Sequence, residues 1–203
     1  MQRVITYIDG FNLYFGLKAK FGRKYLWLDL ERLSSSLLKP GQKLQVVKYF
    51  TSHIQGSPAK IARQDVFLEA LETLPLIQQF FGQFLVNDHV CPACGNIEHI
   101  PSEKMTDVNI ATHMLVDAYE NSFDVAILIS GDSDLSGPIS EIRRLFPSKR
   151  IVVAFPPSRA SFELKKVANA WLTIGRAKID QSQFPDIVVK SDGYNLRKPI
   201  NWT

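Results

Sequence analysis

Short apolar runs alternate along the chain with segments in which apolar residues recur every three or four positions. The runs predict strands buried in a sheet, and the recurring positions predict helices with one apolar face. The clearest run is Val125–Ile129, whose uniformly apolar sequence is typical of a strand buried on both faces of a parallel sheet. Strands are predicted near residues 4–8, 43–54, 125–129, 150–155 and 171–174, and helices near residues 11–21, 28–38, 58–74, 106–121, 139–146 and 159–170.

The alternation of strand and helix predicts an α/β fold of three layers with a mostly parallel central sheet. Residues 83–101 interrupt it, and we expect them to form a small Cys-x-x-Cys hairpin inserted in the domain. From residue 179 the alternation lapses. We therefore predict one domain over residues 1–178 and an extended tail over 179–203 that packs on it through Phe184 and Trp202.

Composition and charge limit the classes of function. The 203 residues are 45% hydrophobic, which is enough for a real core. A balance of 24 basic to 20 acidic residues gives a net charge of +4, which permits a nucleic-acid partner without requiring one. No run approaches the roughly 18 apolar residues that cross a bilayer, and the first apolar run is too short for a signal peptide. We expect a soluble, cytoplasmic protein without a membrane partner.

Acidic residues follow two of the predicted strands. Asp9 closes the first strand, and Asp132 and Asp134 follow the most hydrophobic one, flanked by Ser130 and Ser133. Parallel strands bind ligands beyond their carboxyl ends, and converging carboxylates favour a hard cation such as Mg²⁺ or Mn²⁺. The sequence therefore predicts a metal site at this edge, provided that the two strands are neighbours. The alternatives are local, since Asp134 or Ser133 could cap the next helix and Asp9-Gly10 could be a turn.

Other phosphate and hydrolase motifs are absent from the sequence. The first strand is followed neither by a glycine-rich dinucleotide loop nor by a Walker-type Gly-Lys-Ser/Thr. The chain also lacks the Gly-x-Ser-x-Gly motif of the usual serine hydrolases. These absences disfavour nucleotide hydrolysis of that type and serine-based hydrolysis.

The two cysteines form a single Cys-Pro-Ala-Cys pair. Cys91 and Cys94 are flanked by His89 and His99, which together could complete a tetrahedral Zn²⁺ site. Zinc ribbons usually carry two such halves, so a plain hairpin turn is the alternative.

Three segments resemble the signatures of a known family. They are residues 7–14 (YIDGFNLY), 103–108 (EKMTDV) and 129–135 (ISGDSDL), and they are similar to the motifs of NYN domains, in the bacterial LabA-like branch of the PIN-like nucleases. The resemblance extends from about residue 3 to 175. It implies a PIN-like Rossmannoid fold and metal-dependent cleavage of RNA. It also implies Mg²⁺ or Mn²⁺ ligands at Asp9, Asp107, Asp132 and Asp134, and a supporting role for Asn12.

Some matched positions have alternative explanations or depart from the family pattern. Asp107 could simply be a favourable acid at a helix N-terminus, and Lys104 could face the scissile phosphate or be a surface lysine. Met105-Thr106 replaces the Gly-Val or Gly-Thr of many relatives, and His113 replaces a further acid. Loss of that acid would weaken metal affinity or change metal preference, whether or not His113 reaches the site.

The predicted function is a cytoplasmic Mg²⁺- or Mn²⁺-dependent ribonuclease, with endonuclease action favoured and single-stranded RNA as partner; a homodimer is compatible with it. A non-catalytic RNA-binding or regulatory adaptor with the same fold is the main alternative. A Toprim-type phosphotransfer domain also pairs a first-strand acid with Asp-x-Asp, but leaves Asn12 and Asp107 unexplained. The basic residues that could guide RNA, unless they are merely solvated, are Lys18, Arg23, Lys24, Arg143 and Arg144.

Overall fold

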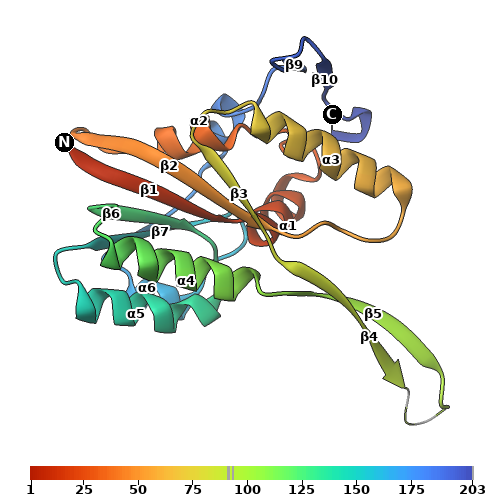
Figure 1. Ribbon diagram of the computed structural model, residues 1–203, viewed down its shortest axis with the longest axis horizontal. Helices are drawn as coiled ribbons and strands as arrows, with labels where there is room; N and C mark the ends of the chain where they lie inside the picture. Colours follow the sequence, from red (N-terminus) through yellow and green to blue (C-terminus); the bar gives the residue numbers. More distant parts are fainter. Residues whose placement is uncertain (91, 93, 203) are drawn as a thin grey trace.

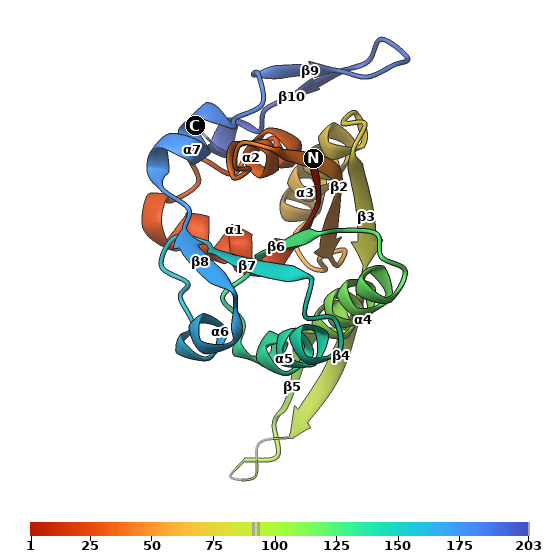
Figure 2. The ribbon, with the colours of Figure 1, turned by 90° about the vertical axis from the view of Figure 1, so that its left-hand side faces the viewer.

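The computed structural model describes residues 1–90, 92 and 94–202 of the chain, with the backbone alone for residues 84–90 and 97–104. Within this part, six parallel strands form the central sheet in the order β3-β2-β1-β6-β7-β8 (Figures 1 and 2). The strands are β1 (Gln2–Asp9), β2 (Gln42–Thr51), β3 (Ile77–Phe81), β6 (Val125–Ile129), β7 (Arg150–Phe155) and β8 (Ala170–Thr173). The predicted α/β fold with a mostly parallel sheet is confirmed.

Helices cover both faces of the sheet, which makes three layers (Figure 2). Side chains of β6 alternate between the two faces, so Ile127 packs in one buried cluster and Leu128 in the other. One face carries α1 (Gly10–Phe21), α2 (Leu30–Ser36), α3 (Pro58–Glu72) and α7 (Arg176–Gln181), and the other carries α4 (Thr106–Tyr119), α5 (Ser136–Leu145) and α6 (Phe162–Val167).

The first strand lies in the middle of the sheet, between β2 and β6. In the register of β1 and β6, Ile8 lies opposite Ile129. Strands β2 and β3 follow β1 outward on one side of the sheet, and strands β7 and β8 follow β6 outward on the other. Their junction is the point at which the strand order reverses, where open α/β sheets bind ligands. The metal-site prediction required that the strands preceding Asp9 and Asp132 be neighbours, and β1 and β6 are paired in the sheet.

Several elements differ from the prediction. Strand β3 was not predicted, because its residues are half-buried or exposed at the sheet edge and lack a clear apolar pattern. Helix α6 begins at Phe162 rather than near residue 159. Ser158 has a left-handed φ of 59°, and Ser161 caps the helix by accepting a hydrogen bond from the backbone N–H of Leu164. A 3₁₀ turn, Ser133–Leu135, precedes α5.

The tail contains more regular structure than the predicted extended segment. Helix α7 crosses the predicted boundary at residue 178, and β9 (Ile187–Val189) pairs with β10 (Asn195–Arg197) in an antiparallel hairpin. The two predicted anchors pack on Trp27, with ring centroids 5.4 Å from Phe184 and 6.3 Å from Trp202. Aromatic contacts therefore hold the tail against the domain.

Strands β4 (Gln83–Val90) and β5 (Ile97–Lys104) form an antiparallel pair, which projects from the body (Figure 1). Cys91 lies outside the described residues, as do the side chains of His89, His99 and Lys104, and Cys94 is exposed. The zinc site stays a prediction. No helix in the described part of the chain has the length and apolar character needed to cross a membrane.

Candidate functional site

The first predicted acid, Asp9, lies where β1 ends and α1 begins. It is 4% exposed and caps the helix. Its Oδ1 accepts a 2.9 Å hydrogen bond from the backbone N–H of Asn12, and its Oδ2 accepts a 2.9 Å bond from Ser130 Oγ. An aspartate is a favoured helix cap, and the positive end of the helix dipole stabilises its charge. The Asp9 carboxylate is therefore buried and held in one orientation.

The loop after β6 is joined to the start of α1. Asn12 Oδ1 accepts a 2.9 Å hydrogen bond from the backbone N–H of Gly131. Ser130, which is fully buried, accepts a 3.0 Å bond from the backbone N–H of Asp132 at the same hydroxyl that donates to Asp9. These bonds fix the positions of two acids that are far apart in the sequence.

The other predicted acids have different surroundings. Asp132 caps the 3₁₀ turn, because its Oδ1 accepts a 3.0 Å bond from the backbone N–H of Asp134. The next helix, α5, has Leu135 at its capping position and no side-chain cap bond there, so the alternative that Asp134 or Ser133 caps this helix is wrong. Asp107 lies in the first turn of α4, which begins after the left-handed Met105 (φ 79°).

A pocket of about 130 Å³ joins these acids. Asp9, Asp107 and Asp132 reach it from β1, α4 and the loop after β6. The predicted Asp134 is exposed and is not among the residues that line the pocket. The remaining lining residues are Phe11, Asn12, Phe15, Thr106 and Arg159.

The pocket differs from the predicted set of four metal-binding aspartates. Among the described residues, no group of three or more Asp, Glu, His or Cys side chains is arranged so that it could hold a metal ion. Mg²⁺ is nevertheless often held by one or two carboxylates, with water and substrate phosphate completing its shell. The three carboxylates and the amide of Asn12 supply hard oxygen donors, so the chemistry of the pocket fits Mg²⁺ or Mn²⁺.

Arg159 is a pocket residue that the sequence analysis missed. It lies in the loop after β7, the strand next to β6 in the sheet, and its guanidinium carbon is 6.0 Å from the centroid of the Phe15 ring. The loop packs so closely on Gly131 that a Cβ there would be 2.4 Å from the Arg159 carbonyl oxygen. A cation therefore lines the same pocket as the three acids. The sequence offered one signal for this role, because Arg159 is a basic residue four positions after the end of the predicted strand at residues 150–155.

His113, on α4, lies in a separate cluster between that helix and strands β2 and β3. Its ring packs on Phe80, with centroids 4.1 Å apart, and its Nδ1 is 3.4 Å from the ammonium of Lys48. Burial, and then the charge of Lys48, lower the pKa of His113. Lys48 also forms a 2.7 Å ion pair with the buried Asp117. His113 does not line the acidic pocket, so it is not positioned there in place of the missing acid.

The predicted RNA-guiding residues separate into two groups. Lys18 and Arg23 line a second pocket of about 390 Å³, which shares Phe11 and Phe15 with the acidic pocket. The others are engaged elsewhere. Lys24 lies over the ring of Tyr25, Arg143 donates to the carbonyl of Val167, and Arg144 pairs with Glu141.

Known proteins provide three comparisons. A model of the NYN domain family matches residues 3–175. The 6-hydroxy-3-succinoylpyridine 3-monooxygenase of Pseudomonas putida is 28% identical over 226 aligned residues, covering 92% of this chain and 71% of that protein. A crystal structure of a Vibrio parahaemolyticus protein of unknown function superposes with a TM-score of 0.58 at 16% identity, covering 90% of this chain and 96% of that one, which bears on the fold alone. Because the family model spans most of the residues, the chain belongs to the NYN domain family, within the PIN-like nuclease superfamily.

Proposed function

We propose that this protein is a ribonuclease that uses Mg²⁺ or Mn²⁺ and cleaves single-stranded RNA as an endonuclease. Membership of the NYN family supports nuclease chemistry. The observation that carries the proposal is the pocket at the reversal of strand order, where Asp9, Asp107 and Asp132 lie together with Arg159. The three sequence motifs around these acids support the LabA-like branch of the family.

The acids and the arginine have complementary roles in this proposal. One or two of the carboxylates of Asp9, Asp107 and Asp132 would hold the ion, with water and the substrate phosphate completing its shell. When bound, such an ion neutralises charge on the phosphodiester and lowers the pKa of water. Arg159 would bind the non-bridging phosphate oxygens, since its planar guanidinium suits bidentate contact with phosphate. Asn12 and Ser130 keep the two acidic loops in register through the hydrogen bonds described above.

The decisive experiment uses Asp132→Asn in the full chain. Asparagine is an equally good cap, so the bond from the backbone N–H of Asp134 survives while the negative charge is lost. We expect cleavage of a labelled single-stranded RNA to fall by a factor on the order of a hundred. The matched control is Asp180→Asn, an exposed aspartate on α7, which should keep wild-type activity.

The same assay tests the metal and the mode of cleavage. EDTA should abolish wild-type cleavage, and Mg²⁺ or Mn²⁺ should restore it. A circular RNA has no ends, so its cleavage separates endonuclease from exonuclease action. Full activity of Asp132→Asn, or cleavage that persists in EDTA, would contradict the proposal. RNA binding without cleavage, and without any effect of Mg²⁺, would instead support the adaptor.

A second candidate function is chemistry on a small aromatic acid. The Pseudomonas putida relative is named for action on 6-hydroxy-3-succinoylpyridine. The pocket of about 390 Å³ combines aromatic rings with cations, which suits a ring that bears a carboxylate. The test is the binding of 6-hydroxy-3-succinoylpyridine, measured by calorimetry, together with chromatography for its consumption in the presence of O₂ and a two-electron reductant, both of which a monooxygenase reaction consumes. Binding and consumption of this compound by a protein that leaves RNA intact would favour the second candidate.

A further inference from the structure

The larger pocket lies directly beside the acidic one. It has a volume of about 390 Å³ and is formed by α1, the turn after it, the end of β2, α3 and the end of the tail. Phe11 and Phe15 line both pockets, so a chain bound in one could continue into the other. The volume is within the range of about 300–1,000 Å³ that is typical of small-molecule sites.

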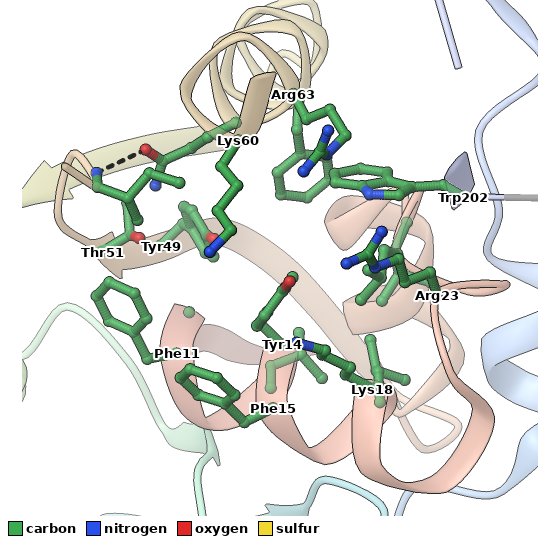
Figure 3. A pocket seen from close by; sticks show the side chains of 18 of the residues that line it. Phe11, Tyr14, Phe15, Lys18, Arg23, Tyr49, Thr51, Lys60, Arg63 and Trp202 are labelled. Carbon is green, nitrogen blue, oxygen red and sulfur yellow. Dashed lines mark hydrogen bonds between the residues drawn. The ribbon is translucent and has the colours of Figure 1, made fainter. Parts of the chain in front are cut away.

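Aromatic side chains form much of its wall, as Figure 3 shows. The Phe67 ring packs on Trp202 at 5.9 Å and on Tyr49 at 6.3 Å between centroids. Phe11 and Phe15 stack at 6.3 Å with an interplanar angle of 22°. Rings of this kind offer stacking surfaces to any flat heterocycle, whatever its hydrogen-bonding pattern. The wall therefore favours an aromatic ligand.

Four cations point into the same space. Lys18, Arg23, Lys60 and Arg63 come from α1, the turn after it and α3 (Figure 3). Within the described part of the chain, the lining residues include no Asp or Glu and none of these four cations forms an ion pair. Burial raises the pKa of Tyr49 to about 12, so its hydroxyl adds no negative charge. The pocket is therefore positively charged and suits an anion.

The wall opposite α1 is held in place by hydrogen bonds. The Oε1 of Gln64 accepts a 2.9 Å bond from the backbone N–H of Ile54, and its Nε2 donates a 2.9 Å bond to the carbonyl of Ser52. These bonds tie the segment after β2 to α3, which carries two of the cations. The pocket is thus largely preformed, as small-molecule sites usually are.

We propose that this pocket binds one unpaired nucleotide of the RNA substrate, with its base among the aromatic rings and its phosphate at the cations. The inference rests on the proposed ribonuclease function and names the subsite that positions the strand for cleavage. Unpaired bases are recognised by stacking on aromatic side chains, and their phosphates by lysine and arginine. The shared wall of Phe11 and Phe15 leads from this subsite to the acids, which favours a nucleotide within a chain over a free aromatic acid.

Binding of uridine 5′-monophosphate in EDTA tests the subsite without catalysis. Calorimetry should detect binding to the wild type, and Arg23→Gln/Lys60→Gln should weaken it about tenfold. Both side chains are exposed, so the fold should be kept. The matched control is Lys20→Gln, an exposed lysine on α1 that does not line the pocket and should bind normally. Asp132→Asn should also bind the nucleotide like the wild type.

The outcomes separate this inference from the proposed function. In cleavage assays, Arg23→Gln/Lys60→Gln should raise KM for RNA about tenfold and leave kcat nearly unchanged. The inference is overturned if the nucleotide does not bind, if the double variant binds it normally, or if inorganic phosphate or benzoate binds as tightly. Nucleotide binding by a protein that cleaves no RNA would support the subsite and refute the proposed catalysis alone.

Discussion

The side-chain Oδ1 of Asn12 accepts a 2.9 Å hydrogen bond from the backbone N–H of Gly131, 119 residues away in the sequence. The backbone N–H of Asn12 simultaneously donates to Asp9. One residue therefore connects the acid at the end of β1 with the loop that carries Asp132. Together with the bond from Ser130 Oγ to Asp9, this bond holds the two acids at one edge of the sheet.

Removal of the Asn12 side chain should separate the two loops. Asn12→Ala leaves the Gly131 N–H without its acceptor, while the Asp9 cap remains because it uses the backbone N–H of residue 12. We expect the free energy of unfolding to fall by about 1–3 kcal/mol in urea titrations. RNA cleavage should also fall at a temperature at which Asn12→Ala is fully folded, so unfolding of the variant cannot be the cause. Asn12→Asp retains an acceptor but adds a fourth carboxylate to the pocket, so it should recover only part of the stability. Wild-type behaviour of Asn12→Ala would contradict the role given to this bond.

Gly131 is required by the close approach of the Arg159 backbone. A Cβ at residue 131 would lie 2.4 Å from the Arg159 carbonyl oxygen, so Gly131→Ala must displace one of the two loops. We expect a loss of about 1–3 kcal/mol of stability, typical of overpacking, and a marked loss of cleavage. The control is Gly137→Ala in α5, where a Cβ meets nothing within 4 Å and alanine should stabilise the helix by up to about 1 kcal/mol. Similar effects of the two substitutions would show that the contact is unimportant.

Much of the fold could be predicted because its strands are buried on both faces. Val125–Ile129 is apolar at every position, and all five residues are buried in the structure. The edge strand β3 lacked that signal. The order of strands could not be derived, since Ile8 and Ile129 become neighbours through packing of the intervening elements rather than through any local pattern.

The candidate site was predicted in part for the same reason. Asp9 and Asp132 follow strands with strong patterns, so their place at one edge could be inferred. Asp134 is only two residues further, but the cap made by Asp132 turns the chain into a 3₁₀ helix instead of continuing the extended segment assumed in the prediction. Arg159 reaches the pocket through a loop with a left-handed Ser158, which its sequence does not signal.

Arg159 should contribute to catalysis more than the other exposed arginines. Arg159→Gln removes the cation that lines the acidic pocket, and we expect kcat/KM for RNA to fall by a factor on the order of a hundred. Arg159→Lys keeps the charge but not the bidentate geometry, so its loss should be smaller. Arg197→Gln on β10 is the exposed control. Equal kinetics for Arg159→Gln and Arg197→Gln would remove Arg159 from the proposed site.

The two acids of the Asp-Ser-Asp segment should differ in importance. Asp132 lines the pocket, whereas Asp134 is exposed and does not. Both substitutions should lower kcat, but the fold reduction for Asp134→Asn should be at least about ten times smaller than that for Asp132→Asn. Parallel titrations with Mg²⁺ would compare the ion concentrations needed for half-maximal cleavage. If Asp134→Asn were the more damaging change, Asp134 would have to move into the pocket when the ion and RNA bind.

The pairing of Arg3 with Asp124 should make stability fall in acid. The Arg3 guanidinium and backbone N–H bind this carboxylate at 2.8 and 2.7 Å, and they lower its pKa from 3.8 to about 2. Because the folded-state pKa lies below the unfolded one, the contribution is fully present above about pH 4 and is lost as the pH falls toward 2. Asp124→Asn removes it. In urea titrations, the difference in unfolding free energy between wild type and variant should therefore shrink between about pH 5 and pH 2.5. A difference that stays constant over this range would mean that the ion pair contributes nothing to the acid sensitivity.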